Sequence, residues 1–382
     1  MKIKILGGGP AGLYAAYLIK RQRPAADVVV FEQNAAGVTF GFGVVFSDKA
    51  LEFLGAADAE TLRLITEDLE TWSDIEVRIH GESIKIDGVG FTAIARLKLL
   101  EILRMRALSV GVTLIDERTI SDLRELGEAD LIIGADGANS LVRRTHEAAF
   151  GTEVSLLNNH FAWFGTTKTF NYLTQTFKSL PQGHFNAHHY RYSKDMSTFL
   201  VEVDQSTFDA VGFGGMTEEQ SRACCEKVFA EELDGHPLVT NRSLWRQFPK
   251  VSNRHYYTAN MVLVGDALRT AHYSIGSGTR LALEDVQALA AALVQHPHSV
   301  LDALASFDAK RRQVIEKMTD AAAQSADWYD QFADHMGLEA WPFAMSYIGR
   351  SGRIDPARLK AMSPRFVAGY EHWKGRSAKV RQ

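Results

Sequence analysis

The sequence predicts an α/β fold in which a lobe built on a parallel sheet is interrupted by an inserted antiparallel sheet. Three observations predict it. Strand and helix patterns alternate over residues 2–31, as parallel βαβ units require. From residue 153 the pattern changes to aromatic-rich strands of period 2, as in HFNAHHYRYS and STFLVEVD, which is typical of an antiparallel sheet. A strand, a glycine loop and an alanine-rich helix then return over residues 261–293, which indicates that the first lobe resumes.

These changes of pattern divide the chain into four segments. We expect the first part of the parallel lobe over residues 1–152 and the inserted sheet over 153–255. The lobe returns with its helices over 256–336, and a basic, partly ordered extension follows over 337–382. The extension carries nine Lys or Arg residues against three acids, which is the charge pattern of an interaction tail.

The first turn of the parallel lobe has the glycine spacing of a dinucleotide site. Gly7, Gly9 and Gly12 match G-x-G-x-x-G between a buried strand and a helix. Gly7 turns the chain, Gly9 admits a pyrophosphate to the backbone, and Gly12 lets the helix pack on the strand. Glu32 ends the second strand, 20 residues after Gly12, where a carboxylate accepts hydrogen bonds from a ribose. The alternative is an ordinary glycine-rich turn with a surface glutamate.

Two more glycine-bearing regions follow strands later in the chain, and each leads into a helix whose N-terminus favours electron-rich atoms. One region contains Asp136 and Gly137. The other contains Gly265 and Asp266, followed by a loop with Gly276 and Gly278 before the helix that starts near Thr279. The Asp136 turn is equally compatible with an ordinary type I′ turn. Arg96 lies near the start of a helix predicted over 94–110, an unfavourable place for a cation unless an anion lies nearby. An exposed arginine is the alternative.

The stretch from residue 37 to residue 46 alternates glycines with aromatic and apolar residues, as GVTFGFGVVF. Glycines allow close approach and the other residues supply an apolar wall, so this stretch suits a pocket for a flat ring. A surface loop that packs against the core is the alternative. Ser47 is expected to cap a helix over residues 48–54.

Bulk composition excludes several classes of protein. The 382 residues have 46% hydrophobic content and a net charge of −4, which gives no general attraction to nucleic acid or to an anionic membrane. No apolar run is long enough to span a bilayer. The two cysteines, Cys224 and Cys225, are adjacent and cannot form an unstrained disulfide as neighbours on a helix. We therefore expect a cytoplasmic protein, and the sequence makes no prediction of its oligomeric state.

Three glycine-bearing turns in this order exceed what a simple nucleotide-binding dehydrogenase needs. Over residues 1–330 the chain resembles the single-component FAD-dependent aromatic hydroxylases, the p-hydroxybenzoate hydroxylase-like group A flavoprotein monooxygenases. The resemblance implies a glutathione-reductase-like FAD-binding lobe, in which Glu32 serves the ADP half of FAD and Arg96 reaches the phosphates. The candidate cofactor-binding residues are Gly7, Gly9, Pro10, Ala11, Gly12, Glu32, Arg96, Asp136, Gly137, Gly265, Asp266, Gly276, Gly278 and Thr279.

The resemblance also implies a reaction. NADH or NADPH reduces FAD, O2 adds to give a C4a-hydroperoxide, and an electron-rich ring attacks its distal oxygen. The segments GFGVVFSD, FAWFGTTKTF and AHYSIGSGTRLALEDV are most similar to salicylyl-CoA 5-hydroxylases and to the 2-aminobenzoyl-CoA monooxygenase domain. They also resemble the hydroxylases of violacein biosynthesis. The expected reaction is 5-hydroxylation of salicylyl-CoA to gentisyl-CoA, with 2-aminobenzoyl-CoA or a tryptophan-derived indole as the alternative substrate.

An aryl-CoA substrate needs cations for its phosphates. Arg191, Lys194 and the basic extension are candidates, although a solvated charged face is the commoner explanation for such residues.

Four residues are candidates for contact with the substrate ring. The candidate catalytic residues are His188, Tyr190, His272 and Tyr273. Alternation along HFNAHHYRYS places His188 and Tyr190 on one face of the inserted sheet, and ordinary sheet packing is the alternative role for both. We expect no metal site from His184, His188 and His189, because they mix faces and lack acidic or thiol partners at ligand spacing.

Other classes of function remain open on the sequence alone. A nicotinamide-only dehydrogenase shares the first glycine motif and contains no flavin. A flavin-bound protein without turnover also fits the motifs, and NADH oxidation stimulated by an aromatic compound would exclude it. A flavin-dependent halogenase is disfavoured because the W-x-W-x-I-P motif is absent.

Overall fold

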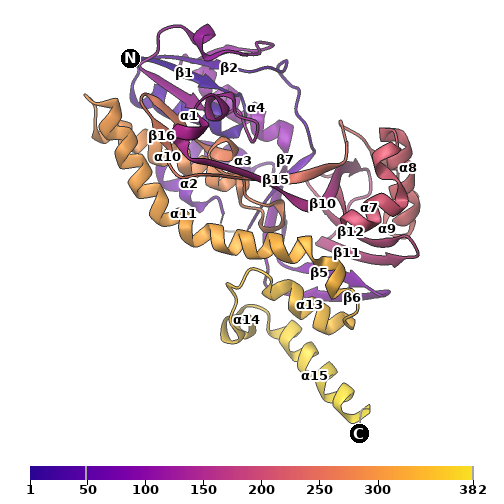
Figure 1. The fold of residues 1–382 in the computed structure, drawn as a ribbon. Coiled ribbons are helices and arrows are strands. Elements are labelled where there is room, and N and C mark those ends of the chain that lie inside the picture. Colours follow the sequence, from indigo (N-terminus) through magenta and orange to yellow (C-terminus); the bar gives the residue numbers. More distant parts are fainter. Residues whose placement is uncertain (48–49, 381–382) are drawn as a thin grey trace.

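The computed structural model describes residues 1–47 and 50–380, which form two lobes with a long helix running from one to the other (Figure 1). The first lobe is built on a six-stranded sheet. Its strand order is β16 (Tyr257–Thr258), β17 (Met261–Leu263), β9 (Leu131–Gly134), β1 (Lys2–Leu6), β2 (Asp27–Phe31) and β8 (Thr113–Ile115). Strands β17, β9, β1, β2 and β8 are parallel, as the alternation of strand and helix predicts.

The parallel register brings three separate turns together. Strand β1 pairs with both β2 and β9, and β17 pairs with β9. Their carboxyl ends therefore lie at one edge of the sheet, where ligands bind in open α/β folds. Gly7, Asp136 and Gly265 follow these three strand ends directly or within two residues, so the sheet gathers the three predicted turns.

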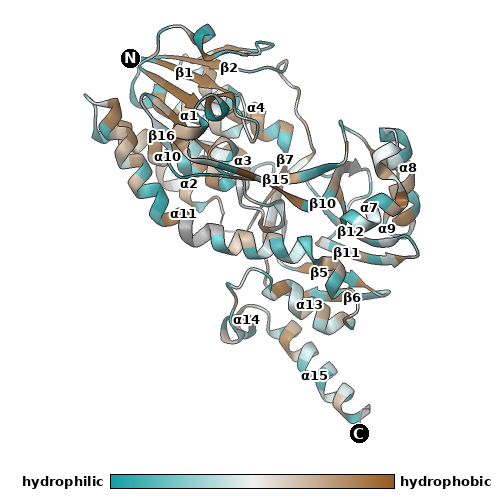
Figure 2. Cartoon of the chain, in the orientation of Figure 1, coloured by the Kyte–Doolittle hydropathy of each residue, from teal (hydrophilic) through white to brown (hydrophobic). Residues whose placement is uncertain are grey.

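Helices cover this sheet and bury its apolar side chains. α1 (Pro10–Gln22) packs between α4 (Arg96–Ser109) and α10 (Gly278–Gln295). Strands β1 and β2 are predominantly hydrophobic, whereas the long helix α11 (Val300–Asp330) carries hydrophilic stretches (Figure 2). Shorter helices of this lobe are α5 (Leu141–Thr145), α6 (Glu147–Phe150), η1 (Leu123–Leu126), η3 (Gly265–Ala267) and η4 (Tyr273–Ile275).

The inserted sheet is larger than the sequence predicted. Its order is β14 (Leu238–Val239), β10 (Thr152–Thr166), β13 (Ser197–Val203), β12 (Gly183–Arg191), β11 (Leu173–Leu180), β5 (Ile75–Ile79) and β6 (Glu82–Ile86), with β15 (Arg246–Asn253) also paired to β10. The four consecutive strands from β10 to β13 pair antiparallel, as expected. The hairpin of β5 and β6 joins from outside residues 153–255, since β5 pairs parallel to β11.

The remaining helices of the inserted lobe lie over its outer face. They are α7 (Gln205–Val211), η2 (Phe213–Gly215), α8 (Glu218–Val228) and α9 (Ala230–Leu233). α8 begins after Thr217, whose side chain accepts a hydrogen bond from the backbone N–H of Gln220 in a capping box.

A small third sheet changes two helix predictions. It contains β3 (Gly43–Ser47), β7 (Phe91–Ala95) and β4 (Glu70–Trp72). Ser47 is the last residue of β3 and not a helix cap; residues 48–49 of the expected helix lie outside the described residues, and α2 (Glu52–Ala57) and α3 (Ala59–Thr66) follow. The helix expected over 94–110 starts at Arg96, because the preceding residues pair as a strand.

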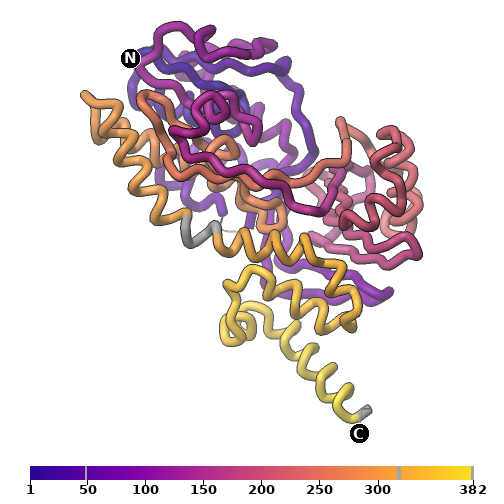
Figure 3. The backbone as a smooth tube through the Cα atoms, in the orientation of Figure 1, coloured from indigo at the N-terminus to yellow at the C-terminus, as the bar shows by residue number. Residues whose placement is uncertain are grey.

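The C-terminal segment is helical and packed, which corrects the prediction of a partly ordered extension. α11 (Val300–Asp330) and α12 (Phe332–His335) lead to α13 (Ala340–Gly349), α14 (Pro356–Met362) and α15 (Pro364–Val380). Phe343, Tyr347 and Phe366 are buried in one apolar core with the β5–β6 hairpin. Only the end of α15 projects from the body of the protein (Figure 3). Within the described chain no helix is long and apolar enough to cross a membrane.

Candidate active site

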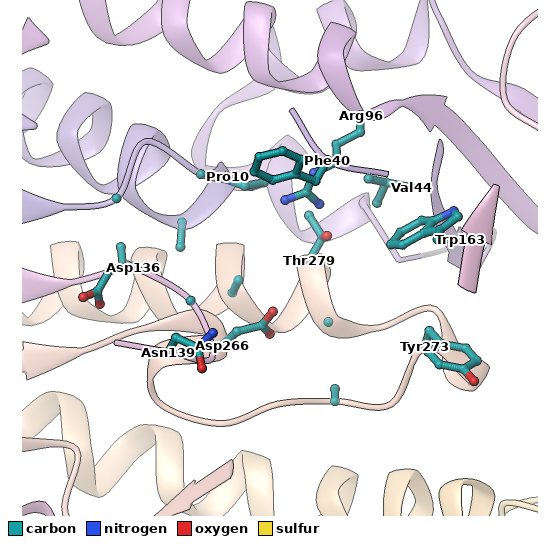
Figure 4. A pocket seen from close by; sticks show the side chains of 18 of the residues that line it. Pro10, Phe40, Val44, Arg96, Asp136, Asn139, Trp163, Asp266, Tyr273 and Thr279 are labelled. Atoms are coloured by element: carbon teal, nitrogen blue, oxygen red, sulfur yellow. The ribbon is translucent and has the colours of Figure 1, made fainter. Parts of the chain in front are cut away.

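A cavity of about 780 Å³ opens where β1, β9 and β17 end and extends to the inserted sheet (Figure 4). Most of the predicted site residues lie in its wall. They are Gly7, Gly9, Pro10, Ala11, Glu32, Arg96, Asp136, Gly137, His188, Tyr190, Asp266, Tyr273, Gly276, Gly278 and Thr279. Gly12, Gly265 and His272 are not in the wall, so the structure gives these three a different task.

The first glycine turn is held by close backbone contacts. Gly7 has φ of +99°, and a Cβ there would lie 2.3 Å from the carbonyl oxygen of Ala135. A Cβ on Gly12 would lie 1.9 Å from the carbonyl oxygen of Gly7. Gly9 is different, since nothing lies within 4 Å of its hypothetical Cβ. Two glycines therefore allow the turn to pack, and Gly9 leaves open space in the cavity wall.

Glu32 organises the same end of the cavity. Its Oε2 accepts a hydrogen bond from the backbone N–H of Gly8 at 2.7 Å, and its Oε1 accepts one from the backbone N–H of Asn34 at 2.8 Å. These bonds fix the carboxylate beside the glycine turn. Asn34 Nδ2 also donates to Oε1 at 2.6 Å. A carboxylate has about four lone-pair sites in total, so acceptor capacity remains for a ligand hydroxyl group.

Two helices present uncapped N-termini at the cavity. α1 follows Gly9 and α10 follows Ser277, and neither residue makes a side-chain capping hydrogen bond. The Ser277 hydroxyl is buried without a partner among the described residues. Unpaired N–H groups and the helix dipoles both favour anionic groups at such positions. The cavity therefore fits a ligand that carries phosphates.

Arg96 and Asp266 face the cavity from opposite walls (Figure 4). Arg96 Nε donates to Thr39 Oγ1 at 3.0 Å, and no carboxylate of the described residues lies within ion-pair distance of its guanidinium. Desolvation lowers the pKa of Arg96 and raises the pKa of Asp266, and the opposite charges of these two groups act against both shifts. Arg96 is half-buried at the start of α4 and makes no ion pair with the described residues. A desolvated cation at this position is unfavourable alone, and an anionic ligand in the cavity offsets this cost.

Asp136 lies in the turn between β9 and α5. Its Oδ2 accepts a hydrogen bond from the backbone N–H of Leu141 at 2.6 Å, whereas its Oδ1 is buried without a partner among the described residues. Burial raises the pKa of this carboxyl group. Oδ1 therefore retains hydrogen-bonding capacity beside the cavity.

Aromatic side chains from the inserted sheet form the other end of the cavity. Phe161 and Trp163 on β10, Phe248 on β15 and Tyr273 line it together. The rings of Phe161 and Tyr273 lie 5.3 Å apart, and those of Phe248 and Tyr273 lie 6.0 Å apart. Such walls suit a planar aromatic guest, because ring faces and edges attract one another at these distances.

His188 and Tyr190 lie at this aromatic end, as predicted. Burial lowers the pKa of His188 to about 3, so its imidazole is neutral at pH 7. Its Nε2 has no hydrogen-bond partner among the described residues. The Tyr190 hydroxyl already donates to the carbonyl oxygen of Gly43 at 3.0 Å. His188 therefore carries unused hydrogen-bonding capacity, whereas Tyr190 is bonded to the first residue of β3.

His272 does not face the cavity, contrary to its prediction as a catalytic residue. Its Nδ1 lies 2.8 Å from Ser274 Oγ, and its ring packs against Phe248 and Tyr329. It lies behind Tyr273 and shapes the turn that carries this residue. Gly265 likewise packs against Ala282, and its backbone N–H donates to Asp285.

The three histidines of β12 point to different surroundings. His184 Nδ1 lies 3.0 Å from Ser179 Oγ, and His189 Nε2 lies 3.0 Å from Thr176 Oγ1. Only His188 of the three lies in the cavity wall. Among the residues that the structure describes, no group of three or more His, Cys, Asp or Glu side chains is placed to hold a metal ion.

Sequence reasoning missed one buried acid. Glu202 on β13 is 1% exposed, and its Oε2 accepts a hydrogen bond from the Tyr273 hydroxyl at 2.7 Å. Burial raises the pKa of Glu202 to about 7. The available signal was its position inside the apolar strand pattern STFLVEVD, where a charged residue needs a buried partner.

Comparison with known proteins places the chain in a family. Residues 114–322 match the model described as "FAD binding domain", which covers more than half of the chain. The chain is also 38% identical over 383 residues to a salicyloyl-CoA 5-hydroxylase of Streptomyces sp, covering 98% of this chain and 74% of that protein. The chain belongs to the FAD-dependent aromatic hydroxylases.

Further relatives of this hydroxylase agree in family and fold. It is 36% identical to the 3-hydroxy-4-methyl-anthranilyl-[aryl-carrier protein] 5-monooxygenase of Streptosporangium sibiricum, over 87% of this chain and 90% of that protein. Among solved structures, a mutant of 2-methyl-3-hydroxypyridine-5-carboxylic acid oxygenase has a TM-score of 0.72 at 18% identity, covering 94% of this chain and 96% of that one. This last similarity shows the shared fold.

Membership in the family confirms FAD as the cofactor, with a nicotinamide as reductant and O2 as co-substrate. Residues 5–38 match an NAD(P)-binding Rossmann-like domain, which contains the first glycine turn. The nicotinamide-only dehydrogenase alternative is wrong, because residues 114–322 match an FAD-binding domain. The hydroxylase is an enzyme, so the alternative of a flavin protein without turnover is also wrong.

Proposed function

We propose that the hydroxylase converts salicylyl-CoA to gentisyl-CoA by hydroxylation at ring position 5. The observation that carries the proposal is the aromatic end of the cavity, which shares one continuous cavity with the glycine turns. The named functions of two relatives support it, since one acts on salicyloyl-CoA and another on an aryl group held by a carrier protein, both at position 5. In both names the aromatic acid is attached to a carrier.

The reaction inserts one oxygen atom of O2 into an aromatic C–H bond and reduces the other to water. NADH or NADPH supplies the two electrons, and one proton from solvent completes the water molecule. When bound, FAD supplies the oxygen-activating chemistry. The tasks left to this chain are to hold the cofactor, to orient the ring and to exclude water.

The glycine-turn end of the cavity suits the dinucleotide part of FAD. We assign the ribose to Glu32 and the diphosphate to Arg96 and the uncapped start of α1. The support is a half-buried cation, without an ion pair among the described residues, next to a helix N-terminus (Figure 4), which together favour an anion. The start of α10 then lies near the flavin end, where its dipole stabilises negative charge on the reduced ring by about 0.3–1 kcal/mol.

At the aromatic end we assign ring orientation to His188 and Tyr273. Neutral His188 has a free Nε2, which suits a hydrogen bond to the phenol group of a salicylyl ring. Tyr273 contributes a ring wall, and its hydroxyl is bonded to Glu202. The surrounding Phe161 and Trp163 keep water away from the reacting carbon.

The test compares salicylyl-CoA with free salicylate as stimulants of NADH consumption by the flavin-loaded enzyme. We expect the thioester alone to accelerate NADH consumption and to yield a product heavier by one oxygen atom, identified as gentisyl-CoA by mass spectrometry. A panel with 2-aminobenzoyl-CoA and an indole tests the alternative substrates. Equal stimulation by free salicylate and its thioester would sink the proposal.

A matched pair of histidine variants tests the assigned site. His188→Phe should lower the fraction of NADH consumption that yields hydroxylated product by about tenfold, the effect of losing about 1.4 kcal/mol of orientation. His184→Phe lies on the same strand but outside the cavity wall and should leave this fraction unchanged. If the fraction of NADH consumption that yields hydroxylated product is equal in both variants, His188 is not part of the proposed site.

A further inference from the structure

Two arginines lie together at the rim of the cavity. Arg246 lines the cavity wall at the aromatic end, next to Phe161 in the pairing of β15 with β10. Arg242 lies four residues earlier, and its guanidinium carbon is 4.6 Å from the centre of the Phe40 ring. Phe40 also lines the cavity, near Pro10 (Figure 4). Both arginines are exposed, so a ligand from solution can reach them.

The backbone holds these two cations close to each other. Arg246 Nη2 donates a hydrogen bond to the carbonyl oxygen of Arg242 at 3.2 Å. Arg242 itself has φ of +55°, a left-handed conformation that costs a non-glycine residue free energy. Strained backbone that places two like charges together is typical of a binding site for the opposite charge.

The loop that carries the arginines is fastened to the cavity wall. Asn241 Nδ2 donates to the carbonyl oxygens of Thr39 at 3.0 Å and Gly41 at 3.1 Å. Ser243 Oγ donates to the carbonyl oxygen of Trp163 at 2.5 Å. These bonds attach residues 241–243 to Trp163 and to the segment around Phe40, and both of these residues line the cavity. The arginines are therefore positioned relative to any molecule that enters it.

Neither arginine is neutralised by the protein. No carboxylate of the described residues lies within 4.0 Å of either guanidinium, and the acid bonded to this loop, Glu218, accepts a hydrogen bond from the backbone N–H of Ser243. Two of the cations considered from the sequence, Arg191 and the end of the basic extension, are less suitable. Arg191 pairs with Glu70 at 2.7 Å, and α15 projects away from the body of the protein (Figure 3).

We propose that Arg242 and Arg246 bind the diphosphate of a molecule whose reactive end enters the cavity. Guanidinium groups bind phosphate oxygens through paired N–H donors, and two of them match the charge of a diphosphate. Two reactants of the hydroxylase carry this group, namely the CoA thioester and the reduced nicotinamide dinucleotide. The assignment to the thioester rests on the proposed function, whereas the assignment to the nicotinamide rests on the family alone.

The test is the double variant R242A/R246A, assayed with salicylyl-CoA, with the N-acetylcysteamine thioester of salicylate, and with NADH varied separately. We expect KM to rise about tenfold for the reactant whose diphosphate binds here. The short thioester has no phosphate, so its KM should be unchanged. The variant K374A/R376A on α15 also loses two positive charges, but far from the cavity, and it serves as the control.

Each outcome decides the inference. A rise in KM that is confined to salicylyl-CoA or to NADH supports the site and identifies which reactant supplies the diphosphate. Calorimetric binding of coenzyme A itself should weaken in the first case. Unchanged KM values for both reactants, or a loss of bound FAD from the double variant, would overturn the inference. Failure of salicylyl-CoA to react would instead refute the proposed function and leave the NADH comparison to decide the site.

Discussion

Replacing Glu202 by Gln should remove a pH dependence from the stability of the hydroxylase. Glu202 is 1% exposed and accepts hydrogen bonds from the Tyr273 hydroxyl at 2.7 Å and from Asn159 Nδ2 at 2.9 Å. Burial raises its pKa from 4.5 to about 7, and the charge of nearby Asp330 acts in the same direction. Glutamine preserves the size of the side chain and one acceptor oxygen, but it does not titrate.

The sign follows from proton binding. Between pH 4.5 and pH 7 the folded protein holds a proton on Glu202 that the unfolded chain has released, so the free energy of unfolding falls as pH rises. This contribution is complete below pH 4.5 and is lost as pH passes 7. The two pKa values differ by about 2.5, and each unit is worth about 1.4 kcal/mol. The expected total is about 3 kcal/mol.

The measurement is urea unfolding of wild type and E202Q at saturating FAD between pH 5 and pH 8. Buried His188 and His272 have lowered pKa values and titrate with the opposite sign in acid, so the difference between the two proteins isolates Glu202. That difference should change in favour of E202Q by about 3 kcal/mol from low to high pH. A difference that is constant with pH would refute the reasoning.

Tyr273→Phe provides an independent check on the same group. The hydrogen bond from the Tyr273 hydroxyl lowers the pKa of Glu202, and phenylalanine removes it while keeping the ring. The loss of stability should therefore move to higher pH in Y273F than in wild type. Movement to lower pH would contradict the assigned bond.

Three further predictions concern the cofactor lobe. Glu32→Ala should weaken FAD retention by about 10- to 100-fold, because hydrogen bonds to a charged group contribute about 1.5–3 kcal/mol. E32Q is the control with a partial loss, and unchanged flavin occupancy would contradict the assignment of Glu32 to the ribose. Gly12→Ala should lower the free energy of unfolding by about 1–3 kcal/mol, whereas Gly9→Ala, whose Cβ meets nothing within 4 Å, should keep stability and lose FAD affinity. Equal stability losses would disprove the distinction. Asp285→Ala should lower the free energy of unfolding, measured in urea, by about 3–5 kcal/mol, because fully buried Asp285 pairs with Arg269 and Arg311 at 2.9 and 2.8 Å. A loss under about 1 kcal/mol would show that the two arginines find other partners.

The three glycine turns were predictable because their requirements are local. Gly7 needs positive φ, and Gly12 needs the absence of a Cβ. Both requirements can be recognised from the spacing of glycines over a few residues. The alternation along β12 likewise placed His188 and Tyr190 on one face, which the cavity wall bears out. His272 was predicted beside Tyr273 in the same loop, but it does not line the cavity, because adjacent residues in a tight turn point in directions that the sequence pattern does not specify.

The sequence by itself determined the class of fold, the order of its segments and the turns that serve a dinucleotide, since strand and helix periodicities and glycine spacing depend on neighbouring residues. Only the tertiary structure decided that the β5–β6 hairpin joins the inserted sheet, that Glu202 lies behind Tyr273, and that Arg242 and Arg246 meet the cavity rim. These contacts join residues that are far apart along the chain. Their formation depends on burial and on strand pairing across the whole molecule, and no local pattern records either.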